Sequence, residues 1–263
     1  MEKTFTFNKI TGYYQDRGSG LPVVLLHGFG EDGAVWDYVA EHLQSDCRVI
    51  IPDLPGYRHS ALPSEQMSIE WMADFVFAIL ENERLFNPVI IGHSMGGYVT
   101  LALTEKHPDL PSKIGLFHSH AFADDEEKKK SRQRAIELIQ QKGTEPFIDE
   151  LYNNLFSPRY VVQNADKVTQ MKKRAYLCPA ETLTGGLRAM MQRPDRIHVL
   201  QSFHKPILFI LGKQDKAIPY EKSLQQCQYA RVSQVHLFEE SGHMGMLEEP
   251  DKAVQVTREF INL

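Results

Sequence analysis

Residues 88–97 read PVIIGHSMGG, an apolar run followed by a Gly-x-Ser-x-Gly pattern centred on Ser94. The apolar run predicts a buried strand, and the pattern from Met95 to His107 predicts a helix. A sharp turn between them would lift Ser94 out of the backbone as a nucleophile, and the flanking glycines Gly92 and Gly96 would let the strand and helix approach closely. Chance alone supplies such a pattern in about one in ten chains of this length, so the strand and helix around it carry the prediction.

The same alternation of strand and helix extends along the chain on both sides of this segment. Further buried strands are predicted at residues 22–27, 48–52, 113–117 and 206–211, with a β-like run at 234–238. Helical patterns cover residues 35–43, 68–85, 223–229 and 250–261. This order favours an α/β fold with a doubly wound, mostly parallel sheet, and residues 4–7 and 11–15 predict an antiparallel edge.

Residues 121–200 interrupt the alternation because they contain helical stretches and no convincing strand. We therefore expect a core made of residues 1–120 and 201–263 and a helical cap formed by residues 121–200. The cap opens with three acids followed by lysines four residues later, a pattern that favours a solvated helix face over a basic contact patch. Its larger apolar residues are expected mainly to pack, with a share of substrate contacts: Phe147, Tyr152, Phe156, Leu187, Met190 and Met191.

A serine hydroxyl needs a base, and His243 is the best placed of the 11 histidines. It lies in Glu-Ser-Gly-His, directly after the β-like run at residues 234–238 and before the last helix. The imidazole in turn needs a carboxylate, and Asp215 follows the buried strand that ends at Leu211. Asp124 is the reserve candidate for this role.

Two backbone amides are expected to stabilise the oxyanion of an acyl-transfer reaction. The loop His-Gly-Phe-Gly follows the strand at residues 22–27 and offers the amide of Phe29, while the start of the helix after Ser94 offers the amide of Met95. His27 is expected to organise this loop and not to perform chemistry.

Taken together, the motifs LLHGFG, DLPGYRHS, IGHSMGG, LFILGKQD and SGHMGMLEEP resemble the α/β-hydrolase superfamily in order and separation, over residues 22–117 and 206–263. The resemblance implies an eight-stranded, mostly parallel sheet, a helical cap after the sixth strand and a site without cofactors. Within the superfamily the chain is most similar to the serine-nucleophile esterase and enol-lactonase-like branch, because Ser94 stands where dehalogenases and epoxide hydrolases carry aspartate. Asp53 is expected to be structural, and Arg58 and His59 depart from the family pattern.

Several residues near the expected site are candidates to line its pocket. His118 and His120 end a predicted strand on one face, where packing and pocket-lining roles both stay open, and His120 is the better placed. His93 and Met244, the neighbours of Ser94 and His243, are further candidates. No third ligand accompanies the two strand histidines, so no metal site is expected.

Composition narrows the function. The net charge of −5 gives no support for binding nucleic acid or a membrane surface. The three cysteines form no CxxC pair, and the first residues lack the apolar stretch of a signal peptide, so a cytoplasmic protein is expected. Its expected oligomeric state is a monomer or a homodimer. The leading hypothesis is hydrolysis of a small carboxylic ester or lactone through an acyl-enzyme. A ligand receptor with little turnover, and a carbon-carbon bond hydrolase or lyase using the same triad, are the alternatives.

Overall fold

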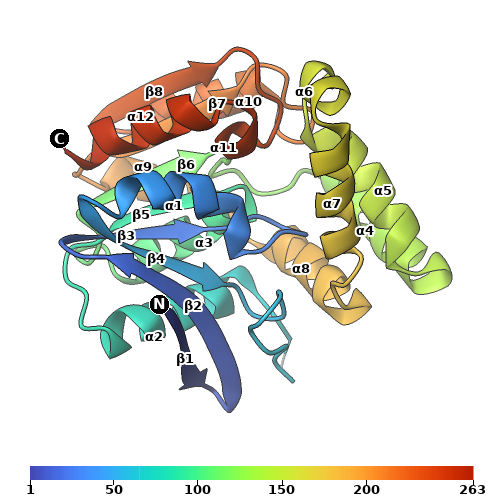
Figure 1. Cartoon of the computed structure of the whole chain (residues 1–263), viewed down its shortest axis with the longest axis horizontal. Coiled ribbons are helices and arrows are strands. Elements are labelled where there is room, and N and C mark those ends of the chain that lie inside the picture. Colours follow the sequence, from blue (N-terminus) through green and yellow to red (C-terminus); the bar gives the residue numbers. More distant parts are fainter. Residues whose placement is uncertain (65, 263) are drawn as a thin grey trace.

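The computed structural model describes residues 1–64 and 66–262 and contains one eight-stranded sheet (Figure 1). The strand order is β1-β2-β4-β3-β5-β6-β7-β8. Strands β1 and β2 pair antiparallel, as do β2 and β4, and all other neighbours pair in parallel. The strands are β1 Glu2–Phe7, β2 Ile10–Gly18, β3 Leu21–Leu26, β4 Cys47–Asp53, β5 Val89–His93, β6 Lys113–Phe117, β7 Ile207–Gly212 and β8 Ser233–Phe238. The predicted mostly parallel sheet with an antiparallel edge is confirmed.

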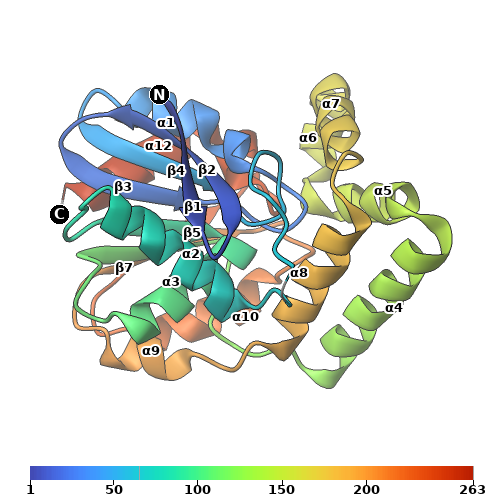
Figure 2. The same ribbon diagram turned by 90° about the horizontal axis from the view of Figure 1, so that it is seen from below.

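Helices cover both faces of the sheet. One face carries α1 (Asp37–Leu43) and α12 (Pro250–Ile261), which contact each other, with the short η1 (Gly33–Trp36) and α11 (Gly245–Glu248) beside them. The other face carries α2 (Ile69–Asn82), α3 (Met95–Lys106), α9 (Ile197–Ser202) and α10 (Tyr220–Gln226), with η2 (Cys227–Tyr229) (Figure 2). Every residue of β5 and β7 is buried, as expected for parallel strands covered on both faces.

Five helices between β6 and α9 lie together at one end of the sheet (Figures 1 and 2). They are α4 (Glu126–Lys142), α5 (Thr144–Leu155), α6 (Pro158–Gln163), α7 (Ala165–Ala175) and α8 (Ala180–Gln192). Helix α4 packs against α5 and α8, and α9 then contacts α3 of the core. Of the apolar residues singled out in this segment, all but Met191 are buried.

The first turn of α4 corrects one expectation from the sequence. Asp125 caps this helix by accepting a hydrogen bond from the Lys128 amide, so Asp124 lies before the helix and not on its face. Asp124 is buried and paired with Arg132 and Arg193. The solvated face predicted for this segment therefore holds for Asp125, Glu126 and Lys130, which are exposed, and is wrong for Asp124. Among the described residues no helix is both long and apolar enough to cross a membrane.

Candidate active site

Ser94 occupies a strained turn between β5 and α3. Its backbone has φ 49° and ψ −113°, a left-handed conformation that is uncommon for residues other than glycine. Three hydrogen bonds hold the turn: the Ser94 amide donates to the Phe117 carbonyl at 3.0 Å, and the Ser94 carbonyl accepts from Ser119 Oγ at 2.7 Å and from the Gly97 amide at 3.0 Å. The strain is thus supported by β6 on one side and α3 on the other.

Glycines make this turn possible because the neighbouring backbone leaves no room for a side chain. A Cβ at Gly92 would lie 2.2 Å from the carbonyl of Gly96, and a Cβ at Gly96 would lie 2.6 Å from the carbonyl oxygen of Leu26. The sequence-based reason for these glycines, close backbone approach, therefore agrees with the structure.

His243 and Asp215 form a buried hydrogen-bonded pair. His243 Nδ1 lies 2.7 Å from Asp215 Oδ2, while Asp215 Oδ1 accepts from the amides of Ala217 and Ile218, both at 2.8 Å. Burial disfavours the charged carboxylate, but the facing His243 and these hydrogen bonds outweigh it and hold the pKa of Asp215 below its ordinary value. Asp215 is therefore an anion that can orient and stabilise the imidazole.

His243 is also fixed through its backbone. Its amide donates to the Leu155 carbonyl at the end of α5 at 2.7 Å, so a cap helix ends against the loop that carries this histidine. Its carbonyl accepts from His93 Nε2 at 2.8 Å. The loop that carries the imidazole is thus tied to the cap and to the turn beside Ser94.

His93 and Met244 do not line the site as the sequence suggested. Both are completely buried, and His93 uses Nδ1 to contact Glu31 Oε2 at 3.0 Å. Burial opposes the charged form of His93, but Glu31 outweighs it and raises the pKa of His93, while the pKa of Glu31 is lowered. Glu31 and His93 form a second carboxylate–imidazole pair, whose ring centroid lies 4.8 Å from that of His243.

The side chains of His118 and His120 lie in different surroundings because β6 ends at Phe117 and His118 has φ 45°. The prediction that they share one face is therefore wrong. His118 Nε2 accepts from the Gly245 amide at 3.2 Å, which leaves the proton on Nδ1, 3.7 Å from Asp215 Oδ2. Burial lowers the pKa of His118 well below its ordinary value, so this ring is neutral. His120 packs instead against Tyr98 and lies in the cavity described next.

Ser94 and His243 line one small cavity of about 110 Å³. Its other lining residues are Phe29, Glu31, Tyr98, His120, Lys128, Arg132, Leu151, Leu155, Met190, Ala217 and Ile218. This volume lies below the roughly 300–1,000 Å³ typical of ligand pockets, so only a small acyl group fits beside the serine in this conformation.

The two amides predicted to stabilise the oxyanion belong to residues at the ends of β3 and β5. Phe29 lines this cavity, in the loop after β3, and Met95 is the first residue of α3, where a helix has no internal acceptor for its amide. Within the described part of the chain, neither amide donates a hydrogen bond to a side chain or to loop backbone. Both remain free to serve a ligand.

The neighbouring polar residues fill structural positions. His27 Nε2 accepts from the Leu54 amide at 2.9 Å, and Asp53 Oδ1 accepts from the Gly33 amide at 3.0 Å, so both organise loops at the ends of β3 and β4. Asp124, the reserve carboxylate, pairs with arginines and not with His243. No group of three or more His, Cys, Asp and Glu side chains among the described residues is arranged to hold a metal ion.

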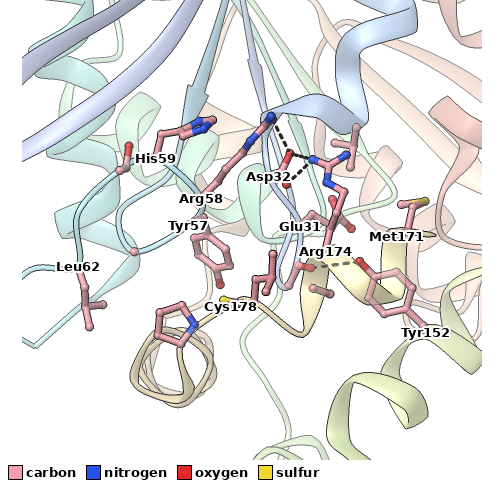
Figure 3. Close-up of a pocket in the computed structure, with 17 residues that line it drawn as sticks. Glu31, Asp32, Tyr57, Arg58, His59, Leu62, Tyr152, Met171, Arg174 and Cys178 are labelled. Carbon is pink, nitrogen blue, oxygen red and sulfur yellow. Dashed lines mark hydrogen bonds and ion pairs between the residues drawn. The ribbon is translucent and has the colours of Figure 1, made fainter. Parts of the chain in front are cut away.

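A larger cavity of about 570 Å³ lies between the core loops and the cap, and neither Ser94 nor His243 lines it (Figure 3). Arg174 of α7 and Arg58 of the loop after β4 both pair with Asp32 there, and the Tyr152 hydroxyl donates to the Gly30 carbonyl at 3.3 Å. Size alone would have pointed to this cavity, but the nucleophile and imidazole are in the smaller one.

Four residues at the site were not predicted from the sequence: Glu31, Ser119, Lys128 and Arg132. Glu31 contacts His93, 62 positions away, and Ser119 contacts Ser94, 25 positions away. A local sequence pattern does not predict contacts over such separations. Lys128 belongs to the charged run whose face the sequence predicts to be solvated, and Arg132 follows that run. Their spacing of four residues on α4 was the one available signal, because it places both on the same helix face.

The sheet order, the helical segment beside the sheet and the serine at a strand-to-helix turn together define an α/β-hydrolase architecture. Residues 22–250 match the family described as the alpha/beta hydrolase fold. The chain belongs to this family.

Similar proteins place it among the esterase-like hydrolases. The pimeloyl-[acyl-carrier protein] methyl ester esterase of Vibrio cholerae is 30% identical, over 94% of this chain and 97% of that protein. A solved esterase from Thermogutta terrifontis, with malate bound, has a TM-score of 0.94 and 27% identity, covering 100% of this chain and 98% of that one. The enol-lactonase from Burkholderia xenovorans LB400 shares the fold, with a TM-score of 0.92 at 19% identity over 99% of this chain and all of that one. The predicted resemblance to this branch is confirmed.

Proposed function

We propose that this protein hydrolyses esters or lactones of small carboxylic acids, with Ser94 as nucleophile, His243 as general base and acid, and Asp215 as the residue that orients His243. One observation carries the proposal. Ser94 and His243 line the same cavity, and His243 is held through Nδ1 by a buried carboxylate. This leaves Nε2 as the nitrogen that exchanges protons with serine and substrate.

The reaction proceeds in two halves. Ser94 Oγ attacks the ester carbonyl as its proton passes to His243 Nε2, and the tetrahedral intermediate collapses by expelling the alcohol, which takes that proton. Water then gives a proton to His243, attacks the acyl-enzyme and releases the acid, and the proton returns to Ser94. The amides of Phe29 and Met95 stabilise the negative oxygen in both halves.

The cavity favours short acyl groups and small alcohols. Its volume of about 110 Å³ leaves little room beyond a few carbon atoms. The Vibrio cholerae relative is named for a methyl ester, which makes methyl esters of short acids the first substrates to test.

The test compares wild type with Ser94→Ala on such a methyl ester. The variant should lose on the order of 10⁴-fold or more in kcat, because the remaining groups cannot form an acyl-enzyme. An active-serine phosphonate should label the wild type and not the variant, and the exposed Ser131→Ala should behave like wild type. Activity that persists in Ser94→Ala would overturn the mechanism.

Turnover and products separate this function from the two alternatives. Many turnovers per enzyme with release of acid and alcohol support ester hydrolysis. A single slow turnover with labelling at Ser94 would instead indicate a receptor. Cleavage of a carbon-carbon bond with no ester turnover would assign the same triad to a different reaction.

A further inference from the structure

Three side chains in the cavity of Ser94 have polar groups for which the proposed reaction has no use. Lys128 and Arg132 come from α4 of the cap, four residues apart and therefore on one face of the helix. His120 comes from the segment after β6. All three face the same small space as the nucleophile.

The charges around this end of the cavity do not balance. Asp124 accepts Arg132 Nε at 2.6 Å and Arg193 Nη1 at 2.8 Å, so one carboxylate faces two guanidinium groups. Among the described residues Lys128 Nζ contacts a carbonyl oxygen, that of Ala217, and forms no ion pair with a carboxylate. The Asp215 carboxylate also attracts Lys128, but its oxygens are held by His243 and by the amides of Ala217 and Ile218. Even with this carboxylate counted beside Asp124, the three cations Lys128, Arg132 and Arg193 leave an excess of one positive charge.

The acidic group that lines the cavity does not restore the balance. Glu31 is engaged by His93 Nδ1 and by the Gly28 amide, each at 3.0 Å. The negative charge of Glu31 is therefore already paired with His93, and these two contacts keep the Glu31 carboxylate away from Lys128 and Arg132.

His120 and Lys128 each have a nitrogen that can form further hydrogen bonds. His120 is buried, and its Nδ1 has no partner among the described residues. Burial lowers the pKa of His120 well below its ordinary value, so it is a neutral ring with a ring nitrogen unsatisfied. Within the described part of the chain Lys128 Nζ makes one hydrogen bond, at 3.3 Å to the Ala217 carbonyl, and burial lowers the pKa of Lys128. Buried polar groups are nearly always satisfied, so such a pair calls for a partner.

We propose that this end of the cavity binds a carboxylate on the acyl part of the substrate, held by Lys128 with support from Arg132 and His120. The substrate class is then the half-ester of a short dicarboxylic acid, or a lactone that carries a carboxylate. The inference rests on the proposed function for the position of the ester at Ser94, but the anion subsite itself depends only on Lys128, Arg132 and His120.

Size and lining fit such a substrate. Because Ser94 and Lys128 line one cavity of about 110 Å³, the ester carbon and the carboxylate must be separated by only a few carbon atoms. Tyr98, Met190 and Ile218 provide contacts for that short chain. The carboxylate would replace water around a half-buried ammonium, where a charge-assisted hydrogen bond is stronger than at an exposed site.

A purely structural role for these residues makes a different prediction. Lys128 would serve only to tie α4 to the segment after β7 through the Ala217 carbonyl, and Arg132 only to neutralise Asp124. In that case charged and neutral esters of the same shape would be cleaved equally well.

The experiment uses two esters of equal shape, methyl hydrogen glutarate and its neutral amide, methyl 4-carbamoylbutanoate. In wild type the charged ester should have the larger kcat/KM by about 10- to 100-fold, the factor expected for a hydrogen bond between charged groups. Lys128→Met should reduce this ratio towards one, mainly through KM, and Lys128→Arg should restore part of it. Lys130→Met removes the same charge from an exposed position of the same helix and should leave the ratio as in wild type.

A binding measurement keeps this inference separate from the proposed function. Ser94→Ala should bind methyl hydrogen glutarate in calorimetry, and Ser94→Ala with Lys128→Met should bind it at least about tenfold more weakly. Ester turnover without charge preference would overturn the subsite and leave the hydrolase intact. Binding that depends on Lys128 without any turnover would support the subsite while the proposed function fails.

Discussion

The Asp215 carboxylate contacts His243 with one oxygen and two backbone amides with the other. Oδ2 lies 2.7 Å from His243 Nδ1, and Oδ1 accepts from Ala217 and Ile218 at 2.8 Å each. The two amides require an acceptor at Oδ1, so the orientation of this side chain is fixed by donors that cannot change. The His243 imidazole therefore contacts only the other carboxylate oxygen, Oδ2.

This arrangement predicts a large effect of Asp215→Asn. The asparagine oxygen must take the place of Oδ1, which turns its NH₂ group towards His243 Nδ1. The amide would donate to Nδ1 and leave the proton on Nε2, so the imidazole could no longer accept a proton from Ser94. We expect kcat for a short methyl ester to fall on the order of 10⁴-fold with little change in KM.

Steady-state kinetics and circular dichroism check this prediction. The exposed Asp109→Asn is the matched control and should keep wild-type kcat. A loss of less than tenfold in Asp215→Asn with an intact fold would mean that the hydrogen bond to His243 does not set its tautomer.

The features that the sequence predicted well are local. The strand β5, the glycines around Ser94 and the start of α3 lie within ten residues of one another, and each is encoded by backbone sterics at its own position. Asp215 and His243 could be predicted to lie together because each follows a strand whose carboxyl end must meet the others at one edge of the sheet.

The features that it did not predict depend on side-chain contacts across the fold. The bond from Ser119 to the Ser94 carbonyl and the pair of Glu31 with His93 join separate strands and loops. Lys128 was predicted to lie on a solvated helix face, but it lines the cavity of Ser94, and the reason is the position at which the helix begins. Helix α4 begins at Glu126, so the charged run is not helical from its first acid, and its phase relative to the core could not be read from spacing alone.

Ser119→Ala tests the support of the strained turn at Ser94. Ser119 Oγ donates to the Ser94 carbonyl at 2.7 Å in a buried region, and alanine would leave that carbonyl with the Gly97 amide alone. We expect the free energy of unfolding to fall by about 1 kcal/mol. The ester kcat should fall severalfold, because the nucleophile is held less firmly. Urea unfolding and ester kinetics check both effects, with Ser131→Ala as the exposed control. Unchanged stability and kcat would show that the segment after β6 does not hold the turn through this bond.

The buried pair of Glu31 and His93 predicts a pH-dependent contribution to stability. The pKa of His93 is raised above its ordinary 6.5, so its contribution is complete below that pH and is lost as pH rises through the folded-state pKa. The pKa of Glu31 is lowered below its ordinary 4.5, so its contribution is complete above that pH and is lost as pH falls through the folded-state pKa. The pair therefore stabilises the fold most between these two ordinary values.

Glu31→Gln removes the charge while keeping an acceptor for the Gly28 amide, and the loss of stability should be larger at about pH 5.5 than at about pH 8.5. The buried neutral histidines, His118 and His120, are present in both proteins, so their own pH dependence cancels in this difference. Urea unfolding of wild type and variant at the two pH values measures it, with the exposed Glu41→Gln as control. An equal loss at both pH values would mean that His93 gains no proton from its contact with Glu31, and that the pair beneath His243 is held by a neutral hydrogen bond.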